Sequence, residues 1–363
     1  MKKVVTIVLV CALALSLAAL SGCGGSSDQV TLRVYNWGVN IADGSDDYID
    51  VIELFEEAYP EIDVIYDTYE TNEALYTRLA GGGVSYDVII PSDYMIARMI
   101  REDMLLPLNF DNIPNYDLVD DTFKNQSYDP NNEYSVPYTW GTVGIIYNTK
   151  YVDEADIGGW DLLWNEKYAD RIVMIDNSRD AFAIAEAMLG YSLNTEDPDE
   201  IQAAADLLME QKPLVQQYVM DQIYDAMGNE EAWIAPYYAG DCMLMMQDNP
   251  DLAFYLPEEE SFNTFIDAMC IPSCAENKAE AELFINFICE PEISGGNMDY
   301  IGYGTPVSAA KEYMDPEMAA SEIAYPDAET LERGEAFGAL SDEAQKLMDN
   351  LFDEVKAGLD MAG

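Results

Sequence analysis

The fold is decided by the stretch Val136–Asn148, which reads VPYTWGTVGIIYN. Its second half is an apolar run of the kind that forms a buried strand. Pro137 cannot donate to a sheet ladder, and Gly141 and Gly144 permit backbone angles that other residues avoid. One set of strand and helix patterns precedes the stretch and a second set follows it. The stretch therefore predicts either a strand that crosses between two lobes or a single buried strand kinked by its proline.

Strand and helix patterns alternate on both sides of this stretch. Upstream, they fall in turn at residues 30–34, 49–59, 62–66, 73–79 and 86–90. Downstream, strands are predicted at residues 171–175, 214–219, 252–256 and 264–271. Helices are expected to begin near Ser178 and Pro198, and to cover residues 278–289 and 341–357. Alternating strands and helices predict an α/β fold in which the sheets are mostly parallel and flanked by helices.

Helix-capping residues mark two of the downstream helices. Ser178 is the expected N-cap of the first. Asp197 is the expected N-cap of the second, with Pro198 at its first position and Glu200 reaching back to the cap.

The composition excludes several classes of function. The chain has 363 residues, and its 17 Lys and Arg against 69 Asp and Glu give a formal net charge of −52. Such a surface repels nucleic acid and anionic lipid, because both are bound through Lys and Arg. The sequence has no histidine, so Ser-His and Cys-His nucleophile pairs are excluded within this chain. The length predicts two domains, and the 49% hydrophobic content is ample for their cores. Histidine is also the usual metal ligand, so its lack favours a site without a metal, and we expect no cofactor.

The N-terminus has the features of an export signal. Lys2 and Lys3 precede an apolar run, and the run ends in Leu20-Ser21-Gly22-Cys23. This motif resembles a bacterial lipoprotein signal, in which cleavage leaves a lipid-modified cysteine at the new N-terminus. We therefore expect a signal peptide at residues 1–22, lipidation of Cys23 and a flexible tether at residues 23–29. An ordinary secretory peptide is the alternative.

Four cysteines remain once Cys11 is removed and Cys23 is lipidated: Cys242, Cys270, Cys274 and Cys289. Outside the cytoplasm they could form two disulfides in any of three connectivities. Free buried thiols are the alternative, and the sequence leaves the choice open.

Aromatic and acidic residues recur where predicted strands end, in both halves of the chain. The aromatic set is Trp37, Tyr94, Tyr238 and Phe265, and the acidic set is Asp93, Asp180, Asp241 and Asp267. Asp267 lies inside an apolar strand, where an unpaired carboxylate is costly, so it needs a partner or a cleft. Ligands of parallel sheets gather beyond the carboxyl ends of the strands. Aromatic faces cover methylene chains and carboxylates bind ammonium groups, so this set suits a flexible polyamine.

At this point the sequence resembles the spermidine/putrescine-binding proteins of ABC importers, over nearly the whole chain after the tether. The stretches that carry the resemblance are VYNW at 34–37, TYETNE at 68–73, YDVIIPS at 86–92, DPNNEYSVPY at 129–138, IGYGTP at 301–306 and YPDAET at 325–330. The resemblance implies a two-lobe, periplasmic-binding-protein-like fold with the ligand cleft between the lobes. It also implies that lobe 1 comprises residues 30–141 and 267–311, and lobe 2 residues 142–266 and 312–363. Hinges are then expected near Gly141, Asp267 and Lys311.

Site residues follow from the resemblance position by position. Trp37, Ser92, Tyr94, Asp267 and Tyr303 match residues of the family's cleft. Other positions differ in residue type. Asp180 stands where the family has Glu, and Tyr238 and Phe265 stand where it has Trp. Asn177 replaces a carboxylate, and Asp241 is a candidate to restore the lost charge. Gly38, Asn40 and Phe337 replace Thr, Tyr and Gln.

The resemblance implies a monomeric receptor anchored by lipid on the extracytoplasmic face of the cell membrane, or periplasmic. Its partners are a polyamine and a cognate ABC permease, and it performs no catalysis. The sequence does not rank spermidine against putrescine. Two alternatives remain: a binding protein for another cation, such as ferric iron held by Tyr237 and Tyr238, and a hydrolase of glycosides that works with carboxylates.

Overall fold

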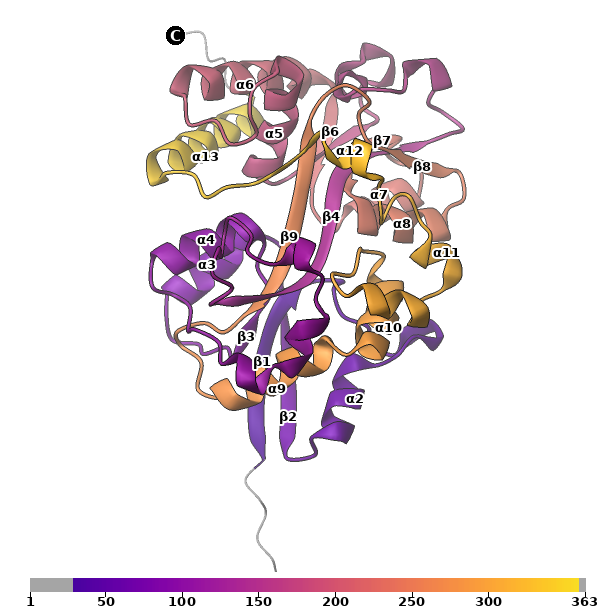
Figure 1. The fold of residues 1–363 in the computed structure, drawn as a ribbon. Coiled ribbons are helices and arrows are strands. Elements are labelled where there is room, and N and C mark those ends of the chain that lie inside the picture. Colours follow the sequence, from indigo (N-terminus) through magenta and orange to yellow (C-terminus); the bar gives the residue numbers. More distant parts are fainter. Residues whose placement is uncertain (1–28, 359–363) are drawn as a thin grey trace, which may run out of the picture.

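A computed structural model of the chain describes residues 29–358 (Figure 1). The predicted signal peptide and Cys23 lie outside the described residues. The strands are β1 Val30–Trp37, β2 Ile62–Tyr69, β3 Val88–Ile89, β4 Ser135–Asn148, β5 Ile172–Ile175, β6 Val215–Val219, β7 Ile234–Tyr238, β8 Leu252–Tyr255, β9 Phe262–Cys270 and β10 Gly334–Ala336. The α-helices are α2 Val51–Ala58, α3 Asn72–Ala80, α4 Asp93–Arg101, α5 Ser178–Leu189, α6 Pro198–Gln211, α7 Ile223–Gly228, α8 Ala239–Asp248, α9 Lys278–Ile288, α10 Pro291–Ile301, α11 Pro316–Ala319, α12 Ala328–Leu331 and α13 Asp342–Ala357.

The strands follow one path through two lobes, in the order β2-β1-β3-β9-β4-β7-β5-β6. At one end β1 pairs in parallel with β2 and β3, and at the other β5 pairs in parallel with β6 and β7. Between these groups, β4 and β9 run antiparallel to each other. Figure 1 shows helices packed around each group and the two long strands passing from one lobe to the other. The predicted α/β, two-lobe architecture is therefore confirmed.

Strand β4 is the crossing strand, so the crossing alternative is the one found. Its first part pairs with β9 as far as Thr142, and its second part, from Val143, pairs with β7 and β8. The register shifts between Pro137 and Thr139, which leaves Tyr138 in a bulge. The phenol of Tyr138 donates to the carbonyl of Asn40 and accepts a hydrogen bond from Asn297. The residue numbers at which the lobes divide stay a prediction.

The glycines of β4 serve close packing rather than unusual backbone angles, contrary to our interpretation of the sequence. Neither Gly141 nor Gly144 has a positive φ. A Cβ on Gly144 would lie 2.4 Å from the ring of Phe254, and one on Gly141 would lie 2.9 Å from the ring of Phe265. Since no side chain fits at either position, these glycines let the neighbouring aromatic rings pack directly on the strand.

The helix caps correct two details of the sequence analysis. Helix α5 is capped by Asn177, whose side chain accepts hydrogen bonds from the backbone N–H groups of Arg179 and Asp180, and Ser178 is the first helical residue. Asp197 caps α6 as predicted. Glu200 does not reach back to that cap, because its carboxylate accepts the hydroxyl of Thr195 instead.

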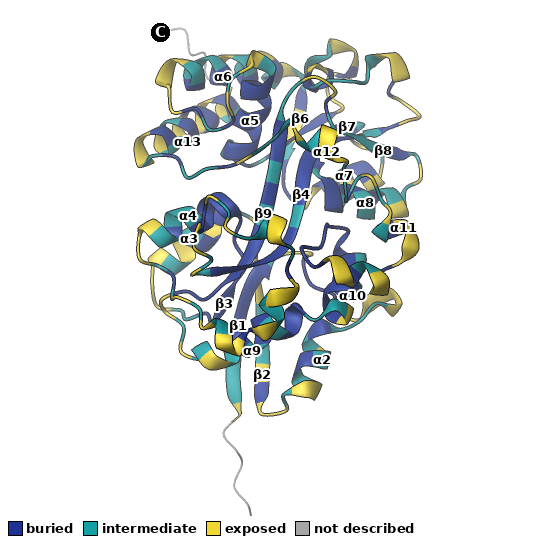
Figure 2. Ribbon diagram, viewed as in Figure 1, coloured by how far each residue is buried: buried dark blue, intermediate teal, exposed yellow. Residues whose placement is uncertain are grey.

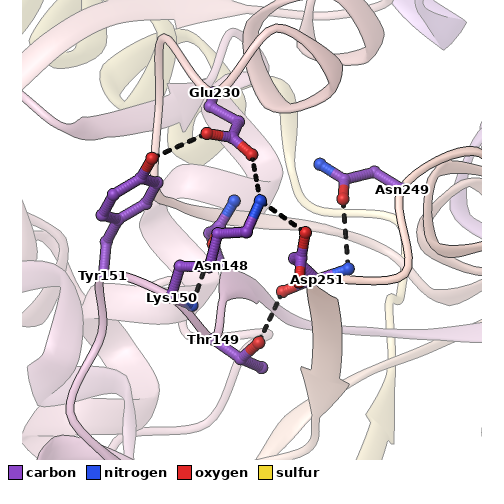
Figure 3. Close-up of polar contacts among 7 residues, drawn as sticks. All are labelled: Asn148, Thr149, Lys150, Tyr151, Glu230, Asn249 and Asp251. Atoms are coloured by element: carbon purple, nitrogen blue, oxygen red, sulfur yellow. Dashed lines mark hydrogen bonds and ion pairs between the residues drawn. The ribbon is translucent and has the colours of Figure 1, made fainter.

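The turn after β4 holds one of the chain's few cations in a surface network (Figure 3). Lys150 Nζ lies 2.9 Å from Glu230 Oε1 and 2.6 Å from Asp251 Oδ2. The phenol of Tyr151 donates to the other oxygen of Glu230 at 2.7 Å, and Thr149 Oγ1 donates to the carbonyl of Asp251. The network fixes the far end of the crossing strand to the loops before β7 and β8.

The four cysteines of the described residues are free thiols, so no disulfide links them. Cys242, Cys270 and Cys289 are buried, and burial raises the pKa of Cys289 to about 12. Cys274 is exposed.

Strands form the buried centre of both lobes, whereas the outward faces of the helices are exposed (Figure 2). Among residues 29–358, none of the helices has the length and apolarity needed to cross a membrane.

Candidate ligand-binding site

A pocket lies between the two lobes and encloses about 750 Å³ of empty space, its open mouth included. All ten residues predicted from the sequence line it: Trp37, Ser92, Tyr94, Asn177, Asp180, Tyr238, Asp241, Phe265, Asp267 and Tyr303. They come from β1, β7 and β9, from the first turns of α4, α5 and α8 and the residues just before α4 and α5, and from the segment after α10. Because parallel strands end at one edge of a sheet, their ends and the helices that follow converge here. The structure thus brings the predicted set together, while the role of each residue in binding stays a prediction.

Asp267 lies on β9 at the centre of this arrangement, and its side chain is only 6% exposed. Ser92 Oγ donates to Asp267 Oδ1 at 2.7 Å, and Asn72 Nδ2 donates in turn to Ser92 Oγ at 3.1 Å. Burial raises the pKa of Asp267 to about 7, although the Ser92 hydrogen bond opposes the shift. Within residues 29–358 the second carboxylate oxygen has no hydrogen-bond donor.

Two further carboxyl groups are held by phenols. Tyr238 donates to Asp180 Oδ2 at 2.8 Å, and burial raises the pKa of Asp180 to about 7. Asp241 accepts the phenols of Tyr224, at 2.7 Å, and of Tyr303, and burial raises its pKa to about 6. Neutral hydroxyl donors orient these carboxyl groups but supply no compensating charge.

Asp93 is a fourth buried acid in the pocket wall. The sequence analysis named it among the strand-end acids but left it out of the predicted site. As the first residue of α4, it accepts N–H groups from Tyr94 at 2.7 Å and from Ile266 at 3.4 Å. Burial raises its pKa to about 8, and the neighbouring Asp267 adds to the shift.

Among residues 29–358, no lysine or arginine lines the pocket. The ion pairs of the described residues all involve acids elsewhere in the protein. Arg179, the neighbour of Asp180 in α5, is buried, donates to Asn194 Oδ1 at 2.7 Å and lies 4.5 Å over the ring of Phe337. The buried acids of the pocket therefore have no ion-pair partner among the described residues, and a cationic ligand would supply one.

Aromatic rings line the same pocket as these acids. Phe265 packs against Tyr238 at 5.6 Å and against Tyr303 at 6.0 Å between ring centroids, both edge to face. Phe337, from the segment after β10, meets Tyr94 of α4 at 5.9 Å. These parts of the pocket wall are therefore apolar, and aromatic faces of this kind can cover a chain of methylene groups.

The side-chain oxygen of Asn177 accepts two N–H groups at the start of α5, so it caps this helix at the edge of the pocket. The structure also adds lining residues that the sequence analysis did not propose: Val39, Tyr69, Glu70, Asn72, Met220, Asp221 and Asn263. Glu70 lies in the quoted stretch TYETNE, directly after β2, and Asp221 follows β6, so position after a strand was the signal that could have identified both.

Tyr237 and Tyr238, the candidate iron ligands of one alternative, both line the pocket. Burial and neighbouring carboxylates raise the pKa of both phenols well above their ordinary value. Within the described residues there is also no group of three or more Cys, Asp or Glu side chains placed to hold a metal ion.

Known proteins share this sequence and this architecture. The model of the bacterial extracellular solute-binding protein family matches residues 50–326. A spermidine/putrescine-binding periplasmic protein of Salmonella typhimurium is 33% identical, over 96% of each chain. The substrate-binding protein PotD of a spermidine/putrescine ABC transporter from Streptococcus pneumoniae is 35% identical with a TM-score of 0.77, over 91% of this chain and 99% of that one. The TpPotD lipoprotein of Treponema pallidum is 27% identical with a TM-score of 0.79, over 90% and 99%.

These matches confirm the resemblance seen in the sequence and the prediction of an extracytoplasmic binding protein rather than an enzyme. The family model and relatives that align over almost their full length point to the same class of protein. The chain belongs to the family of bacterial extracellular solute-binding proteins.

Proposed function

We propose that this protein captures spermidine or putrescine between its lobes and delivers it to an ABC importer. The observation that carries the proposal is a pocket with four buried carboxyl groups, those of Asp93, Asp180, Asp241 and Asp267, and no lysine or arginine in its lining. The names of the relatives, which include spermidine and putrescine, support the same ligand class.

A polyamine fits both components of the wall. Its ammonium groups would donate hydrogen bonds to the free carboxylate oxygens of Asp267 and Asp180. Within residues 29–358, no protein group donates to these two oxygens. Its methylene chain would lie against Phe265 and Tyr238, which pack edge to face in the pocket wall. Charge-assisted hydrogen bonds and cation–π contacts then act at the same time.

Closure of the lobes accompanies binding in this proposal. Residues 30–141 with 267–311 would form lobe 1, and residues 142–266 with 312–363 would form lobe 2. Tyr303 and Asp241, which come from opposite lobes in this division, are hydrogen-bonded across the pocket. A ligand that contacts both lobes shifts the equilibrium toward the closed form by its differential affinity for that form.

Anchoring and assembly complete the proposal. Cys23 would carry lipid and hold the receptor on the extracytoplasmic face of the membrane, and the tether would leave the lobes free to meet the permease. The lipoprotein motif at residues 20–23 supports the anchor. We propose a monomer, because a single chain supplies every wall of the pocket.

Calorimetric titration tests the function. Spermidine or putrescine should bind at a one-to-one ratio, while free lysine and magnesium should compete poorly, because a lined cleft is screened less than an exposed acidic surface. The lack of saturable binding by either polyamine would refute the proposal. Competition by magnesium equal to that by putrescine would show instead that the acidic surface binds cations in general.

A further inference from the structure

Arg179 of α5 is a buried cation that does not line the ligand pocket. Within residues 29–358 its Nε and Nη1 atoms have no hydrogen-bond partner, and neither carboxylate oxygen of Glu186, two turns later in α5, has one. Burial lowers the pKa of Arg179, and the charge of Glu186 opposes the shift. A buried charge without a direct ion pair is a poor source of stability, so the contacts that Arg179 does make indicate its role.

Those contacts lead to one short segment, residues 335–338, which contains the end of β10. Arg179 Nη2 donates to the carbonyl of Gly338 at 3.3 Å and to Asn194 Oδ1 at 2.7 Å. The guanidinium carbon lies 4.5 Å from the centroid of the Phe337 ring. A planar guanidinium can donate hydrogen bonds and cover an aromatic face at the same time, and Arg179 does both on this segment.

Asn194, in the loop between α5 and α6, holds the same segment from the other side. Its Oδ1 also accepts the backbone N–H of Gly338 at 2.6 Å. Its Nδ2 donates to Glu335 Oε1 and to the carbonyl of Ala336, each at 2.9 Å. The backbone before and after Phe337 is therefore fixed by side chains of α5 and the loop that follows it.

The segment places Phe337 where the two lobes meet. In Figure 1 the chain between α12 and α13 runs along the side of the upper lobe that faces the lower one. The Phe337 ring is 5% exposed, lines the ligand pocket and meets Tyr94 of α4 at 5.9 Å. Tyr94 also lines a second hollow of about 290 Å³, its opening included, together with Ala339 and Leu340 of the same segment. The contact between Phe337 and Tyr94 thus lies where the two hollows adjoin.

We propose that Arg179 and Asn194 are positioning residues for ligand binding, which hold residues 335–338 so that Phe337 completes the pocket wall against Tyr94. This inference rests on the proposed function. Neither residue lines the pocket, so both act through the segment. A segment that had to become ordered when the ligand binds would lower the affinity, and a segment held in place beforehand avoids that cost.

An electrostatic role is the alternative for Arg179. Its charge opposes the rise in the pKa of Asp180, the next residue in α5, and so favours the ionised carboxylate in the pocket. Lysine keeps the positive charge but lacks the planar fork of donors. Arg179→Lys therefore separates the two roles, and Asn194→Ala tests the hold on the segment without any change of charge.

The test measures spermidine and putrescine binding by calorimetry in Arg179→Lys and Asn194→Ala, each with Phe337 present and in a Phe337→Ala background. We expect each variant to bind both polyamines about tenfold more weakly than the parent, the scale of one hydrogen bond to a charged group. Phe337→Ala should also weaken binding. In its background neither Arg179→Lys nor Asn194→Ala should cause a further loss, because residues that act through one another are not additive.

Hydrogen exchange of the unliganded proteins provides a second measurement. Backbone amides of residues 334–340 should exchange faster in both variants than in the parent, because the segment is held less firmly. Gln211→Met is the matched control, since Gln211 is a buried polar residue of α6 that donates to the carbonyl of Leu163 at 3.1 Å and does not line the pocket. It should change the melting temperature while affinity and exchange of residues 334–340 stay as in the parent.

Parent-like affinity in Arg179→Lys would overturn the positioning role, because the charge would then suffice. A tenfold loss that persists in the Phe337→Ala background would overturn it as well and assign the effect to Asp180. An equal loss in Gln211→Met would reduce it to general destabilisation. If Arg179→Lys does not fold, Asn194→Ala at its half-buried position carries the same test. A parent that binds neither polyamine refutes the proposed function instead, and hydrogen exchange still measures the hold on the segment.

Discussion

Replacing Asp267 by Asn tests the centre of the proposed site. The change keeps the size of the side chain and an oxygen that can accept the hydrogen bond from Ser92 Oγ, now 2.7 Å from Asp267 Oδ1. It removes only the negative charge. Asn also offers an N–H₂ group, which an ammonium ion cannot use.

The loss of affinity follows from the burial of the carboxylate. Removing one member of a desolvated, hydrogen-bonded charge pair costs about 2–5 kcal/mol. Since about 1.4 kcal/mol is a tenfold change, spermidine and putrescine should both bind Asp267→Asn at least about thirtyfold more weakly.

Asp267→Asn should weaken ligand binding but increase the stability of the unliganded protein. Folding raises the pKa of Asp267 from 3.8 to about 7, so the folded state binds the proton more tightly than the unfolded state. Stability then falls as the pH rises from about 4 to about 7, by at most about 4 kcal/mol for a shift of about 3 pKa units. Asp267→Asn removes this penalty. The variant should therefore melt about 2 °C or more above the parent at pH 8, and at the parent's temperature below pH 4.

Asp87→Asn provides the contrast. Asp87 is a buried acid outside the pocket, and it accepts N–H groups from Arg33, Glu276 and Asn277 at 2.8–2.9 Å. The same replacement there should lower the melting temperature at pH 8, because buried donors lose a charged acceptor. Calorimetry and thermal unfolding at two pH values measure both variants. Spermidine binding within threefold of the parent, or unfolding of Asp267→Asn at pH 8, would refute the reasoning and make Asp267 a structural acid.

Three further predictions concern closure, pH and the anchor. Gly240→Ala should hold the lobes apart, because a Cβ there would lie 2.4 Å from the ring of Tyr303. Small-angle scattering should then show that spermidine compacts the parent protein and not the variant. Equal compaction of both proteins would contradict this prediction. Polyamine affinity should fall about tenfold or more between pH 8 and pH 5, because Asp180 and Asp267, both with pKa about 7, become protonated. Calorimetric titrations across this range should also show that binding releases protons. An affinity that does not change with pH would count against ionised acids as the ligand-binding groups. Cys23→Ala should leave uncleaved precursor or release the protein into the medium, as fractionation would show; processed protein retained on the membrane would exclude the lipid anchor.

Much of the fold could be predicted because strand and helix periods are strong local signals. The strands near residues 30, 62 and 172 alternate or are wholly apolar, and the structure has β1, β2 and β5 there. Strand β7 was not placed, because Pro236 lies inside it and a proline argues against an interior strand. It is accommodated opposite Ile145 of β4. The antiparallel pairing of β4 with β9 could not be predicted, because it joins segments more than a hundred residues apart.

The acids of the pocket were predictable for a different reason. Asp267 interrupts an apolar strand, and Asp180 closely follows the predicted strand at residues 171–175, so the sequence itself marks both as acids that need a partner. Asp241 was a candidate to restore the charge lost at Asn177. Asn177 illustrates the limit, because only the structure shows its oxygen in use as a helix cap. Glu70 and Asp221 illustrate a second limit, because the sequence does not show how the two lobes meet and therefore which strand ends line the same pocket.

The contrast between the pocket and the surface explains how so acidic a protein can be selective. A net charge of −52 attracts every cation, and half-exposed acids such as Glu230 and Asp251 already share one of the chain's scarce lysines. The pocket acids differ because burial removes their water while hydroxyl groups, and not cations, hold them in place. A hydrated metal ion or a single amine can satisfy one of them but cannot cover the apolar walls between them. Only a ligand that spaces several ammonium groups along methylene chains can pair with the buried acids of the pocket and also pack against its aromatic walls.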